Sequence, residues 1–164
     1  MPMPLLVADS GPLIALARLN LLNVPGCYFE STFIAAAVWD EVTRNPKFDE
    51  MEWLQAAATG GLIKIVDEVL VPPESLQHAG VDVGEQMAIA LALALPATLL
   101  VDDRRARRAA ESLGVSTLGT MALLVRARKD GLTLPLKPLL ELQRTTGYFL
   151  SPGLIEQVLN AVDE

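Results

Sequence analysis

Two short, largely apolar runs, residues 5–8 and 97–101, lead directly into aspartates: Asp9 after the first, and Asp102 and Asp103 after the second. A continuous apolar run of this length is typical of a strand buried on both faces, as strands are in the parallel sheets of α/β proteins. Such proteins bind ligands beyond the carboxyl ends of their strands. If both runs belong to one parallel sheet, the sequence predicts that these acids share one edge of it.

The rest of the chain alternates between strand and helix patterns. We expect further strands near residues 28–34, 62–66 and 115–118. The expected helices are 12–22, 36–44, 50–59, 84–95, 103–113, 119–130, 136–145 and 152–162, the last with Ser151 as N-cap. This alternation indicates an α/β three-layer sandwich, with a mostly parallel central sheet flanked by helices. The 164 residues fit a single domain, 1–164, with a C-terminal helical appendage at about 133–164.

Composition and targeting signals restrict the class of protein. Hydrophobic residues make up 51% of the chain, enough for a packed core. The only cysteine, Cys27, cannot form an internal disulfide, and we expect it to be a small buried apolar side chain. The first residues lack the basic leader of a signal peptide, and the longest apolar stretch, 87–101, is shorter than the ~20 residues that span a bilayer. We therefore predict a cytoplasmic protein with no membrane contact.

Two further acids, Glu41 and Glu85, lie on expected helices that would flank the same edge of the sheet. Glu41 falls between Val38 and Val42, on or beside the buried face of its helix, where an unpartnered carboxylate is costly. Converging carboxylates, with no lysine or arginine matched to them, suit a hard divalent cation such as Mg²⁺ or Mn²⁺.

Each of these acids also has a simpler structural explanation. Asp9, Ser10 and Asp103 each precede an expected helix and could act as N-caps. Glu85 has the spacing of the third position of a capping box, and Glu41 has an arginine one turn later with which it could pair. It is the combination, with buried strands delivering acids to one edge, that favours a binding site.

The distribution of positive charge limits how the chain could bind nucleic acid. The net charge of −7 argues against a broad basic face but permits a local one. Arg104, Arg105 and Arg108 lie on the expected helix that begins beside the acids, where they could contact RNA phosphates. The alternative is an ordinary solvated helix face that pairs with Glu111.

Other residues offer little support for different chemistry. His78, the only histidine, lies in a polar loop, where we expect a solvated side chain. One histidine and one cysteine make a zinc site or a histidine-assisted nucleophile implausible. We expect the scattered large aromatic side chains to be core residues: Phe29, Phe33, Trp39 and Trp53.

Four segments together resemble the motifs of PIN domains. They are Leu-Leu-Val-Ala-Asp-Ser-Gly-Pro-Leu-Ile-Ala-Leu (5–16), Val-Trp-Asp-Glu-Val (38–42), Gly-Glu-Gln-Met-Ala-Ile-Ala-Leu-Ala (84–92) and Leu-Leu-Val-Asp-Asp-Arg-Arg-Ala-Arg (99–107). The set is most similar to the prokaryotic branch related to VapC toxins, in the group with Gly-Glu in the third motif and Asp-Asp-Arg-x-Ala-Arg in the fourth. The resemblance covers about residues 4–160. One departure is that residues 35–37 are alanines, where the family commonly has a proline before the second motif's helix.

The resemblance implies a metal-dependent endoribonuclease that acts on RNA. The implied ligands of one or two Mg²⁺ or Mn²⁺ ions are Asp9, Glu41, Glu85 and Asp103. Asp102 would be a fifth acid of the pocket or a helix cap, and Ser10 would hydrogen-bond Asp9 or a metal-bound water, or act as an N-cap. An antitoxin protein and a second copy of the chain are candidate partners. A toxin and a stand-alone RNA-processing nuclease both remain open.

Two other functions fit part of the pattern. A phosphoacceptor receiver domain also places paired aspartates at strand ends, but there the pair normally follows the first strand. The lysine expected near the end of that fold also has no good candidate here. A PIN-like domain that works as a catalytically silent binding or interaction module is the second alternative. The presence of all four acidic motifs argues against it.

Overall fold

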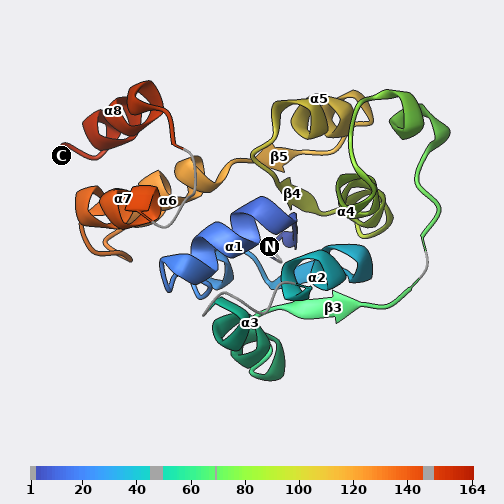
Figure 1. Ribbon diagram of the computed structural model, residues 1–164, viewed down its shortest axis with the longest axis horizontal. Coiled ribbons are helices and arrows are strands. Elements are labelled where there is room, and N and C mark those ends of the chain that lie inside the picture. The colour runs from blue at the N-terminus through green and yellow to red at the C-terminus, as the bar shows by residue number, and fades with distance from the viewer. Residues whose placement is uncertain (1–2, 45–49, 69, 146–149) are drawn as a thin grey trace.

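The computed structural model describes residues 3–44, 50–68, 70–145 and 150–164, with helices around a central sheet (Figure 1). The strands of this five-stranded sheet are β1 (Leu5–Ala8), β2 (Ser31–Ala35), β3 (Lys64–Val66), β4 (Thr98–Leu100) and β5 (Thr117–Leu118). Their order is β3-β2-β1-β4-β5, and every pairing is parallel. The predicted α/β sandwich with a parallel sheet is thereby confirmed.

The helices lie close to the predicted positions. They are α1 (Ser10–Arg18), α2 (Ala36–Thr43), α3 (Glu50–Thr59), α4 (Val83–Ala94), α5 (Arg104–Ser112), α6 (Thr120–Lys129), α7 (Leu136–Thr145) and α8 (Pro152–Ala161), with short 3₁₀ turns η1 (Pro25–Cys27) and η2 (Glu74–His78). β2 begins three residues later than predicted, at Ser31, because η1 precedes it. α1 begins two residues earlier, directly after Asp9. α2 begins at Ala36 even though no proline precedes it.

The strand order creates a switch point between β1 and β4. From β1 the chain moves outward through β2 to β3, then returns to the other side of β1 for β4 and β5. Because parallel crossovers are right-handed, this reversal puts the α1 and α5 crossovers on opposite faces of the sheet. Ala8 pairs with Leu100, and the amide of Asp9 donates to the Leu100 carbonyl at 3.0 Å. Asp9 and the residues after β4 therefore leave the sheet side by side.

The strands on either side of this switch point are buried on both faces, as their apolar sequences predict. Leu6, Val7, Leu99 and Leu100 are each at most 1% exposed. α4 packs against β1, β2 and β4 and also contacts α2 and α5. The site described below is thus carried by elements that are anchored in the core.

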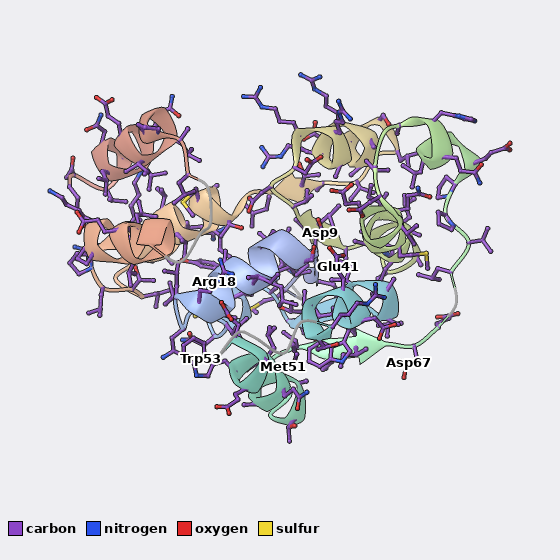
Figure 2. All side chains as sticks on the ribbon, in the orientation of Figure 1. Asp9, Arg18, Glu41, Met51, Trp53 and Asp67 are labelled. Atoms are coloured by element: carbon purple, nitrogen blue, oxygen red, sulfur yellow. The ribbon has the colours of Figure 1, made fainter. Side chains whose placement is uncertain are left out.

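Of the four aromatic side chains that we expected in the core, three pack in or against it, but Trp53 does not. Phe29 is buried, and Phe33 and Trp39 are partly buried against the core. Trp53 is 42% exposed on α3 (Figure 2). An ion pair between Arg18 and Glu50 holds α3 to α1. The prediction of a core role is therefore wrong for Trp53, because α3 turns its Leu54 and Ala57 inward instead.

The prediction that Cys27 is buried is also wrong. Cys27 is exposed at the end of η1, where its thiol lies 3.9 Å from the carbonyl of Asn23. The turn buries Pro25 in place of Cys27, which leaves the cysteine facing solvent.

The last three helices lie together on one side of the molecule, at the left of Figure 1. α8 contacts α6 and α7, and α6 contacts α1. Ser151 caps α8 as predicted, since its hydroxyl accepts a hydrogen bond from the amide of Leu154 at 3.2 Å. The Tyr28 hydroxyl donates to Asp130 at the end of α6, and the Arg126 guanidinium stacks over the Tyr28 ring at 4.1 Å. No helix in the described part of the chain is long and apolar enough to cross a membrane.

Candidate active site

Asp9 lies at the switch point with a buried, unsatisfied carboxylate oxygen. It follows β1 at the N-cap position of α1, and it is 6% exposed. Its side chain accepts no capping hydrogen bond, so the N-cap explanation does not account for this carboxylate. Oδ1 is buried without a hydrogen-bond partner among the residues that the structure describes. Because an unpartnered buried oxygen is costly, it needs another explanation.

Burial raises the pKa of Asp9 from 3.8 to about 7. A backbone hydrogen bond from Ser10 lowers this pKa, and the charges of Glu85, Asp82 and Glu41 raise it. The carboxylates that surround Asp9 therefore make its ionised form less favourable, which is the effect that a bound cation would reverse. Figure 2 shows Asp9 and Glu41 close together near the centre of the molecule.

Glu41 lies between the starts of α1 and α4. Its Oε1 atom accepts a hydrogen bond from the Ser10 hydroxyl at 3.4 Å, and its Oε2 atom lies 2.7 Å from the position that a Cβ atom would take on Gly84. The alternative pair with Arg44 is not among the ion pairs of the described residues. Glu41 is also exposed, so it lies beside the buried helix face rather than on it. The neighbouring valines are buried, and Glu41 itself extends toward the open edge.

Glu85 forms the capping box that its sequence spacing predicts. Its Oε2 atom accepts from the amide of Asp82 at 2.9 Å, and the Asp82 Oδ1 atom accepts from the amide of Glu85 at 2.8 Å. Burial raises the pKa of Glu85; the backbone hydrogen bond from Asp82 lowers it, and the charges of Asp82, Asp103 and Glu41 raise it. Glu85 is therefore a cap and a member of the acid cluster at the same time. The sequence analysis did not assign Asp82 to the acid cluster, yet its charge also raises the pKa of Asp9.

The two adjacent aspartates after β4 have different partners. Asp103 is exposed and caps α5, since its Oδ1 atom accepts from the amide of Ala106 at 2.9 Å. Asp102 is half-buried and contacts Thr120, which lies at the start of α6. Its Oδ1 atom accepts from the Thr120 amide at 2.8 Å and its Oδ2 atom from the Thr120 hydroxyl at 2.7 Å. Thr120 was not predicted from the sequence, although Gly119-Thr120 before an apolar helical pattern marks a helix start.

Comparison with known proteins identifies the family of this chain. A family model described as a PIN domain matches residues 5–164. The chain belongs to the PIN-domain family. Its fold is similar to that of a PilT N-terminus domain protein from the hyperthermophilic archaeon Sulfolobus solfataricus P2, with a TM-score of 0.54 over 75% of this chain and 92% of that one. The two sequences are 18% identical, so this likeness concerns the fold alone. No curated protein matches the sequence.

The donor chemistry of this PIN domain fits a divalent cation. Asp9 contributes a buried oxygen with no partner, and the charged neighbours that shift its pKa most are all acids. Carboxylate oxygens are the ligands that Mg²⁺ and Mn²⁺ prefer. Among the residues described, no three acidic, histidine or cysteine side chains converge tightly enough to enclose an ion. The fit therefore rests on the orphaned oxygen and the excess negative charge rather than on a formed coordination shell.

The arginines of the PIN domain's α5 divide into two groups. Arg104, Arg105 and Arg108 are exposed, and the Arg105 side chain lies 3.4 Å from the Cβ position of Gly80, after η2. Arg107 turns inward, and its Nη2 atom donates to the carbonyl of Val101 at 3.1 Å. Glu111, which could have paired with an arginine, accepts a hydrogen bond from the hydroxyl of Thr117. His78 is exposed at the end of η2, as expected.

Proposed function

We propose that this PIN domain is a metal-dependent endoribonuclease that hydrolyses RNA phosphodiester bonds. Asp9, Glu41, Glu85 and Asp103 would hold Mg²⁺ or Mn²⁺ at the switch point of the sheet. PIN domains are generally nucleases, which supports the class of reaction. The observation that carries the proposal is the buried, unpartnered Oδ1 atom of Asp9 in the field of three other acids.

The chain's own residues would hold the acids in place. A bound Mg²⁺ or Mn²⁺ would supply a Lewis acid for the phosphate and lower the pKa of a bound water. The backbone of Asp9 is tied to β4 through Leu100, and burial of the residue leaves its side chain little freedom. Glu41, Glu85 and Asp103 each accept a hydrogen bond through a single oxygen atom, as described above. That bond orients the carboxylate while its second oxygen can accept a ligand or a proton.

RNA would approach along the exposed face of α5. Arg104, Arg105 and Arg108 are exposed on this helix, which begins directly after Asp103. Their guanidinium groups can donate to phosphate oxygens close to the acids. The net charge of −7 argues against a broad basic face, so RNA contact would centre on this region.

The biological role we propose follows the four sequence motifs. They resemble those of the prokaryotic branch related to VapC toxins, so we propose an antitoxin protein as the partner and the cytoplasm as the location. A second copy of the chain is a further proposed partner. A stand-alone RNA-processing nuclease would use the same site, and co-purification with a neighbouring gene product separates the two roles.

A catalytically silent binding module is the alternative function. The observation that favours it is that Glu85 and Asp103 already serve as helix caps, and that no three of the described acids enclose an ion. Such a module would bind RNA or protein without cleaving it. RNA mixed with the protein would therefore stay intact when Mn²⁺ is added.

The experiment that tests the proposal is an RNA cleavage assay with purified full-length protein. We expect cleavage of single-stranded or structured RNA with millimolar Mn²⁺ or Mg²⁺ and none in excess EDTA. An Asp9→Asn variant, purified in parallel, controls for contaminating ribonucleases and should be inactive. Cleavage that persists in EDTA, or that is equal in this variant, would show that the acid cluster is not the active site.

A further inference from the structure

The turn that carries Asp103 is held from two sides. On the strand side, the amide of Val101 donates to the carbonyl of Leu118 at 2.9 Å. On the helix side, the amide of Arg107 donates to the carbonyl of Asp103 at 2.9 Å. Asp102 lies between these two anchors, directly before Asp103 in the chain.

Asp102 directs its carboxylate onto the start of α6 rather than onto α5. Both of its oxygens accept from Thr120, one from the amide at 2.8 Å and one from the hydroxyl at 2.7 Å. Thr120 is fully buried, and the N-cap residue of α6 is Gly119, which has no side chain to offer. Asp102 therefore satisfies the first amide of α6 and places negative charge at the positive end of that helix.

Arg107 reaches the same point from α5. Its Nη2 atom lies 2.7 Å from the position that a Cβ atom would occupy on Gly119, and the Oδ1 atom of Asp102 lies 3.5 Å from that position. Nη2 also donates to the carbonyl of Val101, as noted above. Any side chain at position 119 would displace the guanidinium, so glycine is needed here for space.

We infer that Asp102, Arg107, Gly119 and Thr120 form a clasp that positions Asp103, and that Asp102 is not itself a metal ligand. The inference rests on the proposed function, since it names what holds one of the proposed ligands. It gives adjacent aspartates different roles. Both oxygens of Asp102 already accept hydrogen bonds from Thr120, whereas Asp103 uses only one oxygen in its cap and keeps the other for a ligand. The clasp also joins the site to α6, which contacts α1 and α8.

A double-mutant cycle on Mn²⁺ affinity distinguishes a positioning residue from a ligand. We expect Asp102→Ala and Thr120→Val each to weaken Mn²⁺ binding by roughly tenfold, as loss of a partner that orients a ligand does. The double variant should bind Mn²⁺ no more weakly than the poorer single variant, because both changes remove the same interaction. Affinity is measured by calorimetric titration of the full chain, and RNA cleavage should fall in kcat more than it rises in KM.

Matched variants separate positioning from a general loss of stability. Thr120→Ser keeps the hydroxyl and should restore Mn²⁺ affinity. Thr32→Val changes another buried threonine, in β2, and should leave Mn²⁺ affinity unchanged. If Asp102→Ala fails to fold, Asp102→Asn retains an acceptor for the Thr120 amide and should lose only part of the affinity.

Two outcomes would overturn the inference in different ways. If changing Asp102 abolishes the Mn²⁺ response while Thr120→Val binds Mn²⁺ as wild type does, Asp102 is a ligand and the clasp is wrong. If Asp103→Asn binds Mn²⁺ with wild-type affinity, the proposed metal site itself fails, and the clasp has no ligand to position.

Discussion

The Oε2 atom of Glu41 lies 2.7 Å from the position that a Cβ atom would occupy on Gly84. Gly84 is the second residue of α4 and has ordinary helical geometry, so glycine is not needed there for its backbone freedom. It is needed because the Glu41 carboxylate fills the space of a side chain. In the Gly-Glu pair of the third motif, the glycine therefore leaves room for the Glu41 carboxylate. The glutamate of the pair, Glu85, is itself an acid of the cluster.

Gly84→Ala should impair the site without unfolding the protein. The added methyl group must push the flexible end of Glu41 away, which separates that carboxylate from Ser10 and Asp9. Alanine also favours a helix over glycine by up to about 1 kcal/mol, so the melting temperature should change little. We expect a smaller Mn²⁺-induced rise in melting temperature and at least tenfold slower RNA cleavage.

Gly153→Ala is the matched control for this substitution. Gly153 is the second residue of α8, the same helical position, and nothing lies within 4 Å of its Cβ position. This variant should keep the full Mn²⁺ response and full activity. If Gly84→Ala also keeps the full Mn²⁺ response and full activity, Glu41 does not belong to the site.

The stability of the metal-free protein should decrease as the pH rises from about 4 to about 7. The folded-state pKa of Asp9 is raised from 3.8 to about 7, so folding favours its neutral form. The stabilising contribution of that neutral form is complete below the unfolded pKa and is lost as pH rises through the folded pKa. Each pKa unit corresponds to about 1.4 kcal/mol, so the decrease in unfolding free energy should reach a few kcal/mol. Urea unfolding in EDTA across this pH range measures it.

Asp9→Asn should flatten this pH dependence, since the amide does not ionise. Mn²⁺ should stabilise wild-type protein most at neutral pH and above, where the acids are deprotonated. If wild-type protein and Asp9→Asn show the same pH dependence in EDTA, Asp9 does not titrate as described.

Asp103→Asn should be at least as stable as wild type without metal, yet inactive. Its amide oxygen can still cap α5 by accepting from Ala106, and one charge that raises the pKa of Glu85 is removed. Thermal melts with and without Mn²⁺ should give a smaller metal-induced shift than for wild type. Asp67→Asn, an exposed acid far from Asp9 in Figure 2, controls for the loss of one charge. Equal metal shifts in Asp103→Asn and wild type would exclude Asp103 as a ligand.

Changing Arg104 and Arg108 together to alanine should weaken RNA binding and leave Mn²⁺ affinity nearly unchanged. Both side chains are exposed on α5 beside the acids. The slope of log affinity against log salt should flatten by roughly 0.7–0.9 for each phosphate that the variant no longer neutralises. A variant with Lys129→Ala and Lys137→Ala loses the same charge from exposed positions on α6 and α7 and should bind RNA as wild type does. If both variants keep the wild-type salt slope, the α5 arginines belong to an ordinary solvated face.

The amino-acid sequence by itself determined the parallel sheet and the acids at its edge. Buried parallel strands need continuous apolar runs, and the residues that follow them are placed by chain direction alone. Asp9 and Asp103 could therefore be assigned to one edge before any contact was known. The capping box of Glu85 and the cap of Ser151 were also readable, because both depend on residues three positions apart.

Only the tertiary structure decided which residues far along the chain Asp102 and Glu41 contact. Asp102 bonds to Thr120, 18 residues later, and Glu41 lies against Gly84, which is far away in the sequence. The exposure of Glu41 and Cys27 likewise depends on how their elements dock, and no local pattern encodes that docking. Hydrophobic periodicity determines which face of an element is buried. The orientation of a polar side chain at a sheet edge instead follows from the particular loops and helix ends that pack around it.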